Sequence, residues 1–136
     1  MPLKVTLKPK ERIFINGAVV VNEEKSRVNL VVVNDVPILR EKDILTEKSA
    51  DTPCKRIYLT VQLMYMDKEH LSEYHKNYWK RVGEVVKAAP STTTIIQKVS
   101  EQILIGNYYR ALKLTQRLIQ YEKELIDGGT KSFQGV

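Results

Sequence analysis

The chain has 136 residues, 43% of them hydrophobic, so it is long enough for one domain or for two small halves that share a core. Its 22 basic and 16 acidic side chains give a net charge of +6, which suits an anionic partner such as RNA but does not by itself predict one. No apolar run approaches ~18 residues, so we expect no membrane-spanning helix. A single cysteine and an N-terminus without the apolar stretch of a signal peptide favour a cytoplasmic protein.

The first part of the chain, residues 1–46, is predicted to form an antiparallel β-unit. Residues 3–7 alternate apolar and polar side chains, which is the period of a strand with one buried face. Asn16-Gly17 lies between two short strand patterns, residues 12–15 and 18–22. This dipeptide is the strongest short signal for a hairpin, because a type I′ turn needs positive φ at both central positions.

Two further strands are expected before the pattern changes. Residues 27–33 form a nearly continuous β-branched run, which predicts a central strand. Pro37 predicts an edge strand that continues to Arg40, because proline cannot donate to a sheet. After Thr46 the apolar period changes from about two to about 3.6, so we expect helices in the rest of the chain.

The first expected helix runs from Pro53 to about Met66. Asp51-Thr52 supplies a cap, and proline suits the first helical position. Apolar side chains cover most of its circumference, so we expect it to be the most buried helix. A second helix, about residues 68–89, is expected to begin after Asp67 as its cap.

The last two helices are predicted to form an αα-hairpin. Ser91-Thr92-Thr93 should cap a helix over about residues 94–105, which Gly106 ends. Asn107 should then cap a final helix over about residues 108–126, and the short link requires antiparallel neighbours. The predicted fold class is therefore α+β, with an N-terminal antiparallel β-unit followed by a four-helix C-terminal half that ends in this hairpin.

Three segments follow from these elements. Residues 1–46 are expected to be the β-unit, and residues 47–126 a helical half packed on it. Asp127-Gly-Gly opens a polar C-terminal stretch, so residues 127–136 are expected to be a flexible tail.

The chain offers no recognisable catalytic or metal constellation. His70 and His75 are five residues apart, about 140° around a helix, so they cannot clamp one ion as an i, i+4 pair would. His75 lies near the apolar stripe of its helix and is interpreted as a packed, hydrogen-bonded side chain. Cys54 sits in the first turn of a helix, where the dipole can lower a thiol pKa, but no histidine is near it in sequence. We interpret Cys54 as a small buried apolar residue, and we expect no metal, no cofactor and no enzymatic activity.

Two basic helix faces are the candidate binding residues. Lys76, Lys80 and Lys87 fall within about 40° of one another, opposite the apolar stripe of their helix, and Trp79 lies at its edge. Arg110, Lys113 and Arg117 project from one side of the last helix. Basic side chains neutralise phosphates, and exposed aromatic rings stack unpaired bases. An ordinary solvated, lysine-rich helix surface is the competing interpretation.

Five segments, spread from residue 1 to about residue 125, point to one family. They are Met1-Pro-Leu-Lys, Asn16-Gly-Ala, Pro37-Ile-Leu-Arg-Glu-Lys-Asp-Ile-Leu-Thr46, Asp51-Thr-Pro-Cys-Lys-Arg-Ile-Tyr58 and Gly106-Asn-Tyr-Tyr-Arg-Ala-Leu112. In this combination and order the chain resembles the FlbT family, post-transcriptional regulators of flagellin synthesis in α-proteobacteria.

The resemblance implies a cytoplasmic regulator of flagellum biogenesis that associates with the 5′ untranslated region of flagellin mRNA and alters its translation or decay. The resemblance also implies a small partner protein, FlaF. It gives no catalytic residues to transfer to this chain. Repression and activation both remain open, and so does a homo-oligomeric state.

A competing hypothesis is a protein-binding adaptor. The hairpin of residues 94–126 could grip flagellin or FlaF in a helix groove, with indirect effects on mRNA. An enzyme acting on RNA would need a metal site or an acid–base pair, and the sequence supplies neither.

Overall fold

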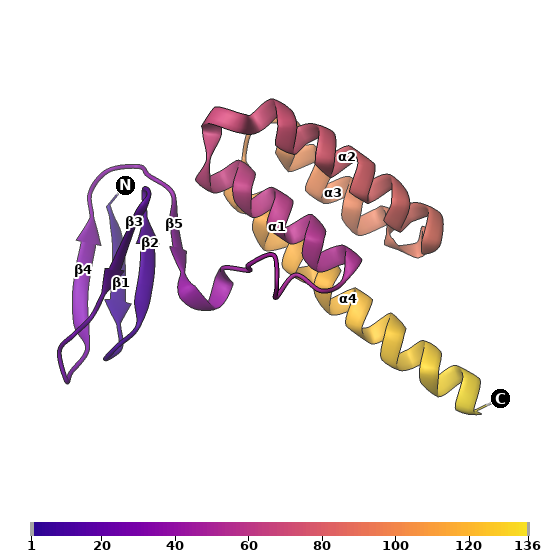
Figure 1. The fold of residues 1–136 in the computed structure, drawn as a ribbon, viewed down its shortest axis with the longest axis horizontal. Coiled ribbons are helices and arrows are strands. Elements are labelled where there is room, and N and C mark those ends of the chain that lie inside the picture. Colours follow the sequence, from indigo (N-terminus) through magenta and orange to yellow (C-terminus); the bar gives the residue numbers. More distant parts are fainter. Residues whose placement is uncertain (1, 136) are drawn as a thin grey trace. The chain divides into compact units, whose positions relative to one another are not determined.

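The computed structural model describes the backbone of residues 2–135 and the side chains of residues 2–128. It confirms the predicted α+β class, with antiparallel strands in the N-terminal part and helices after them (Figure 1). The chain divides into two compact units, Met1–Ile44 and Leu45–Val136, each described here by itself. We call them the β-unit and the helical unit. The boundary falls two residues before the one expected from the sequence.

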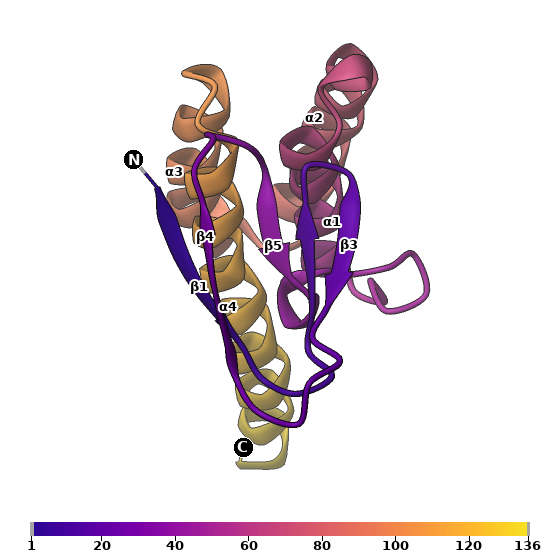
Figure 2. The same cartoon turned by 90° about the vertical axis from the view of Figure 1, so that its left-hand side faces the viewer.

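Five strands build two small sheets in the β-unit (Figures 1 and 2). Strands β1 (Leu3–Leu7) and β4 (Val28–Val32) pair antiparallel as a two-stranded sheet. A three-stranded antiparallel sheet has the order β3 (Ala18–Val21), β2 (Arg12–Ile15), β5 (Ile38–Arg40). β5 pairs only with β2 among the described residues, so the predicted edge strand after Pro37 is confirmed.

The core of the β-unit is small and apolar. Val5, Leu7 and Ile13 are buried, and half-buried hydrophobic side chains pack against them: Ile15, Val20, Leu30 and Ile38. Val5 and Leu7 share a face because side chains alternate along a strand. Arg40 links the two sheets by donating to the Thr6 carbonyl (3.0 Å) and to the Glu11 carboxylate (3.2 Å).

The prediction of a central strand at residues 27–33 is wrong. β4 pairs only with β1 among the described residues, and its two-stranded sheet leaves Val31 55% exposed. A β-branched run favours a strand because branched side chains fit the pleated surface. That preference does not decide whether both faces of the strand find a partner, and here only the face of Leu30 packs on the core.

The hairpin turn at Asn16-Gly17 is confirmed. It joins β2 to β3 with two residues, and φ is +46° at Asn16 and +92° at Gly17. Positive φ at both central positions defines the type I′ turn, whose twist matches that of the strands it connects.

We predict that Gly17→Val destabilises the β-unit by roughly 1–3 kcal/mol, because a β-branched residue resists positive φ. No atom lies within 4 Å of a Cβ built at Gly17, so the loss would come from the backbone alone. Thermal and denaturant unfolding would measure it, with Ala18→Val on the adjacent exposed strand position as the control. Equal stability of Gly17→Val and wild type would show that the turn can adopt another backbone conformation at residue 17 without loss of stability.

The helical unit begins with α1 (Pro53–Met66), as predicted. Thr52 is its N-cap, since its side chain accepts a hydrogen bond from the Lys55 backbone N–H (3.2 Å). Among the described residues α1 has more buried side chains than any other helix, and Ile57 and Val61 are fully buried. It packs against both α2 and α4, so it forms the centre of this unit.

The second predicted helix starts as a 3₁₀ turn, Lys68–His70, and continues as α2 (Leu71–Ala88). Asp67 caps the 3₁₀ turn by accepting from the Glu69 backbone N–H (3.0 Å), as predicted. α3 (Thr93–Leu104) follows another 3₁₀ turn, Pro90–Thr92. The prediction of a Ser-Thr-Thr side-chain cap is wrong. The Thr92 hydroxyl donates backwards to the Ala89 carbonyl (2.7 Å) and makes no cap hydrogen bond.

Gly106 and Asn107 link α3 to α4 as predicted. Gly106 has φ +79°, and the Asn107 side chain accepts from the Arg110 backbone N–H (3.2 Å). α4 spans Tyr108–Gly135, so residues 127–135 are helical and the predicted end at residue 126 is wrong. Glycine lowers helix propensity by about 1 kcal/mol without forbidding a helix, which is why Gly128-Gly129 does not end it. Flexibility of residues 127–136 stays a prediction, and Val136 lies outside the described residues. Across the described residues no helix combines the length and apolarity needed to cross a bilayer.

Candidate nucleic-acid interface

Lys76, Lys80 and Lys87 are all exposed on α2, and together we call them the α2 face. They point away from the buried side of the helix, which carries Tyr78, Val82 and Val85. Gly83 lies between Lys80 and Lys87 on the same side at about 100° per residue, and nothing stands within 4 Å of its Cβ position. The α2 face therefore carries three exposed cations with open space at Gly83, flanked by exposed Glu73 and Glu84.

Trp79 stands at the edge of this strip, as its sequence position suggested. Its side chain is 44% exposed, and its ring meets the Tyr78 ring edge-on at a centroid distance of 5.0 Å. Tyr78 is fully buried and its hydroxyl hydrogen-bonds Ser100 Oγ (2.8 Å). The indole therefore contacts a buried neighbour and still presents part of its surface to solvent.

Arg110, Lys113 and Arg117 are exposed on α4, and we call them the α4 face. They lie opposite the buried side of α4, which carries Ala111, Thr115 and Leu118. A shallow depression of about 520 Å³ runs along them, and it is also lined by Leu114, Gln116 and Gln120. The α4 face therefore offers cations and neutral amides on one open surface.

Tyr109 belongs to the same surface and was missed by the sequence reasoning. It is 44% exposed, with Lys113 Nζ 5.4 Å from its ring centroid and the Tyr65 ring of α1 5.4 Å away. Its neighbour along the chain is Tyr108. It is half-buried, and its hydroxyl shares a hydrogen bond with His75 Nε2 (3.2 Å), which also confirms the packed role of His75. The i, i+4 spacing of Tyr109 and Lys113 is the signal that could have singled out Tyr109.

The structure does not join the two faces into one patch. α1 packs against both α2 and α4, and each face points away from the buried side of its own helix. Within the described part of the chain, none of the six cations is in a salt bridge. Their positive charge is therefore available to an anionic ligand.

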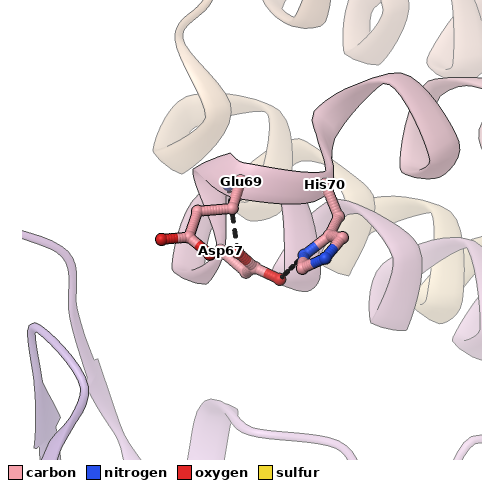
Figure 3. Close-up of side chains that lie close together, drawn as sticks. All are labelled: Asp67, Glu69 and His70. Atoms are coloured by element: carbon pink, nitrogen blue, oxygen red, sulfur yellow. Dashed lines mark hydrogen bonds and ion pairs between the residues drawn. The ribbon is translucent and has the colours of Figure 1, made fainter.

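Asp67, Glu69 and His70 form a cluster at the start of α2 that the sequence reasoning did not consider (Figure 3). Their ligand atoms lie within 4.8 Å of one another. One Asp67 oxygen already accepts from His70 Nδ1 (2.8 Å) and from the Tyr74 hydroxyl (2.6 Å), and the other accepts from the Glu69 backbone N–H. The carboxylate is therefore occupied as a helix cap, and the cluster is a hydrogen-bond network.

This network shifts the pKa values of His70 and Asp67 in opposite directions. The hydrogen bond to Asp67, followed by the negative charge of that carboxylate, raises the pKa of His70 above 6.5. Hydrogen bonds from Tyr74 and then from His70 lower the pKa of Asp67 below 3.8. Burial opposes both shifts only weakly, since both groups meet solvent.

We predict that the network stabilises the protein between about pH 4 and pH 6.5. The raised pKa of His70 gives stability that is complete below pH 6.5 and is lost as the pH rises through the folded pKa. The lowered pKa of Asp67 gives stability that is complete above pH 3.8 and is lost as the pH falls through the folded pKa. Denaturant unfolding of wild type and His70→Gln from about pH 4 to about pH 9 would measure it. A stability difference that does not shrink toward pH 9 would contradict the pairing.

Cys54 is buried, as expected, and is unsuited to nucleophilic chemistry. Burial, followed by the negative charge of Glu122, raises the pKa of the Cys54 thiol to about 12. Glu122 reaches the start of α1 from α4 and accepts from the Thr52 hydroxyl (2.5 Å) and from the Cys54 backbone N–H (3.0 Å). The helix dipole that could have activated the thiol stabilises this carboxylate instead.

An apolar groove of about 390 Å³ opens beside this contact. It is lined by the starts and ends of several helices: Pro53, Cys54 and Arg56 of α1, Arg81, Glu84, Val85 and Ala88 of α2, Ala89, Thr92, and Glu122, Leu125 and Ile126 of α4. Arg56 and Arg81 make no salt bridge among the described residues. A groove of this kind suits an apolar side chain of a partner better than a phosphate.

Comparison with known proteins identifies the class and then the family. No solved structure matches the chain. The family described as "Flagellar protein FlbT" matches residues 3–126. The chain is 45% identical over 125 residues to "Probable flagellum biosynthesis repressor protein FlbT 1" of Bradyrhizobium diazoefficiens, covering 92% of this chain and 85% of that protein.

Two further relatives agree. A "Probable flagellum biosynthesis repressor protein FlbT" of Rhodopseudomonas palustris is 45% identical over 126 residues, covering 93% of this chain and 98% of that protein. The "Flagellum biosynthesis repressor protein FlbT" of Caulobacter vibrioides is 36% identical over 126 residues, covering 91% and 89%. The relatives of this chain thus form a class of bacterial proteins named as repressors of flagellum biosynthesis. The chain belongs to the FlbT family.

Proposed function

We propose that this protein is a cytoplasmic, post-transcriptional regulator of flagellin expression that binds the 5′ untranslated region of flagellin mRNA. Membership of the FlbT family supports the regulatory part, since the relatives are named flagellum biosynthesis repressors. The RNA-binding part rests on one observation. Each of two helices presents three exposed cations that make no salt bridge with any described residue, beside a partly exposed aromatic ring.

These two surfaces have the chemistry that a flexible RNA strand requires. Lysine and arginine neutralise phosphates and release counterions, which supplies affinity without sequence preference. Trp79 adds ring surface on which an unpaired base can stack. The open space at Gly83 and the depression along the α4 face leave room for a strand to approach.

Regulation then follows from occupancy of the leader and needs no chemistry from this chain. A protein bound across the leader competes with ribosome binding, or changes the exposure of the RNA to nucleases. Decay of the message would come from recruited or competing factors, and the protein itself would act without a cofactor or a catalytic step.

We predict that replacing Lys76, Lys80 and Lys87 together by Gln weakens binding of a flagellin leader RNA. Each phosphate contact on a single strand contributes about 0.7 to the slope of log affinity against log salt, so the slope should flatten by roughly two. The same two effects, weaker binding and a flatter salt slope, are expected when Arg110, Lys113 and Arg117 are replaced together by Gln. Titrations at several salt concentrations would measure this, with fluorescence of Trp79, the single tryptophan, as a local reporter on α2.

The matched control replaces Lys4, Lys8 and Lys25 by Gln. These lysines are exposed on the β-unit, and their replacement removes the same amount of charge. The control should keep most of the affinity. Equal affinities and slopes in wild type and both helix variants would show that the two faces are ordinary solvated surface. Cleavage of the RNA by the purified protein, lost in a point variant of this chain, would contradict the non-enzymatic role.

The apolar groove supports a second candidate, the protein-binding adaptor. Leu125, Ile126, Val85 and Ala88 could hold a segment of FlaF or flagellin, with Arg56 and Arg81 at its rim. RNA effects would then be indirect. Retention of leader RNA only when purified FlaF or flagellin is present, abolished by Ala88→Glu, would favour this candidate over direct binding.

A further inference from the structure

Tyr109 is held in place before any ligand arrives. Its ring lies between Tyr65 of α1, at a centroid distance of 5.4 Å, and the ammonium group of Lys113 one turn along α4, at 5.4 Å. It remains 44% exposed, so part of the ring meets solvent. A ring that is both fixed and solvent-facing loses little conformational entropy when a ligand stacks on it.

The surroundings of Tyr109 specify the chemical class of that ligand. Lys113 and Arg117 follow it along one side of α4 at spacings of about one and two turns, and Arg110 lines the depression on the α4 face together with them. A flat ring beside a row of cations matches a base beside its phosphates. A duplex hides the faces of its bases in the stack, so only an unpaired nucleotide can use the ring.

We propose that Tyr109 is the stacking platform for an unpaired base of a single-stranded RNA segment whose phosphates are neutralised by Arg110, Lys113 and Arg117. Lys113 exchanges its position over the ring for a phosphate, and the base takes the ring face that the ammonium group leaves. This inference rests on the proposed RNA-binding function and assigns the base contact to one residue. It also adds a residue whose contribution is independent of charge.

That independence makes the proposal testable. Stacking releases no counterions, so removing the ring should lower affinity equally at every salt concentration and leave the salt slope unchanged. Removing the cations should flatten the slope instead. The two variants thus report separately on the ring and on charge neutralisation.

The probes are a single-stranded RNA of about 12 nucleotides and the same strand annealed to its complement. Wild type should prefer the single strand. Tyr109→Ala should weaken single-strand binding by about 5- to 150-fold with an unchanged salt slope, and should reduce the preference over the duplex. Tyr109→Phe should retain binding because it keeps the ring, whereas Tyr109→Leu should behave as Tyr109→Ala although it keeps apolar bulk against Tyr65. Circular dichroism and thermal midpoints would confirm that each variant is folded.

The outcomes separate this inference from the proposed function. Unchanged single-strand affinity in a folded Tyr109→Ala, with binding still lost in the Arg110, Lys113, Arg117 variant, would overturn the stacking platform alone. Loss of affinity in Tyr109→Phe equal to that in Tyr109→Ala would also overturn it, since the ring would then not be the group that matters. Absence of salt-dependent binding to either probe by wild type would overturn the proposed function itself.

Discussion

The helical unit depends on the burial of α1. Ile57, Val61 and Met64 have no exposed surface, because α2 and α4 cover the helix from two sides. Each such side chain contributes about 1.5–3 kcal/mol relative to an exposed position, so this helix supplies a large part of the apolar burial of the unit. Its first turn is also tied to α4, because Glu122 accepts hydrogen bonds from Thr52 and from the Cys54 backbone.

The position of α1 determines which surfaces remain for binding. α2 packs its apolar side against α1, and α4 packs its apolar side against α1 and α3. Their opposite sides therefore face solvent, and they carry Lys76, Lys80, Lys87, Arg110, Lys113 and Arg117. The same packing places Tyr65 of α1 against Tyr109 of α4, which connects the core to the surface we propose for RNA.

Much of the fold could be predicted from sequence because its signals are local. The Asn16-Gly17 turn, the Thr52-Pro53 helix start and the Gly106-Asn107 link each follow from the φ preference or hydrogen-bonding capacity of one or two residues. Signals that depend on distant partners failed. The strand of residues 28–32 was assigned to the centre of a sheet, although pairing is decided by which other strand reaches it. Buried Gln62 was not anticipated, since its partner is the backbone of Leu45, seventeen residues away (2.8 and 3.0 Å).

The candidate site was predictable in the same partial way. Helical periodicity placed both cationic trios on outward surfaces correctly, because that requires only the buried side of each helix. It could not show that Tyr109 is exposed while Tyr108 is bonded to His75, since this depends on a neighbouring helix. Nor could it reveal the apolar groove, which four separate segments of the chain build together.

Photo-crosslinking of wild-type protein to a flagellin leader RNA, with the crosslinked peptides located by mass spectrometry, tests the central claim most directly. We expect crosslinks in the segments of α2 and α4 that carry Trp79 and Tyr109, reduced by competitor single-stranded RNA and by high salt. Crosslinks confined to the β-unit, or none above those of a protein without RNA affinity, would contradict the account.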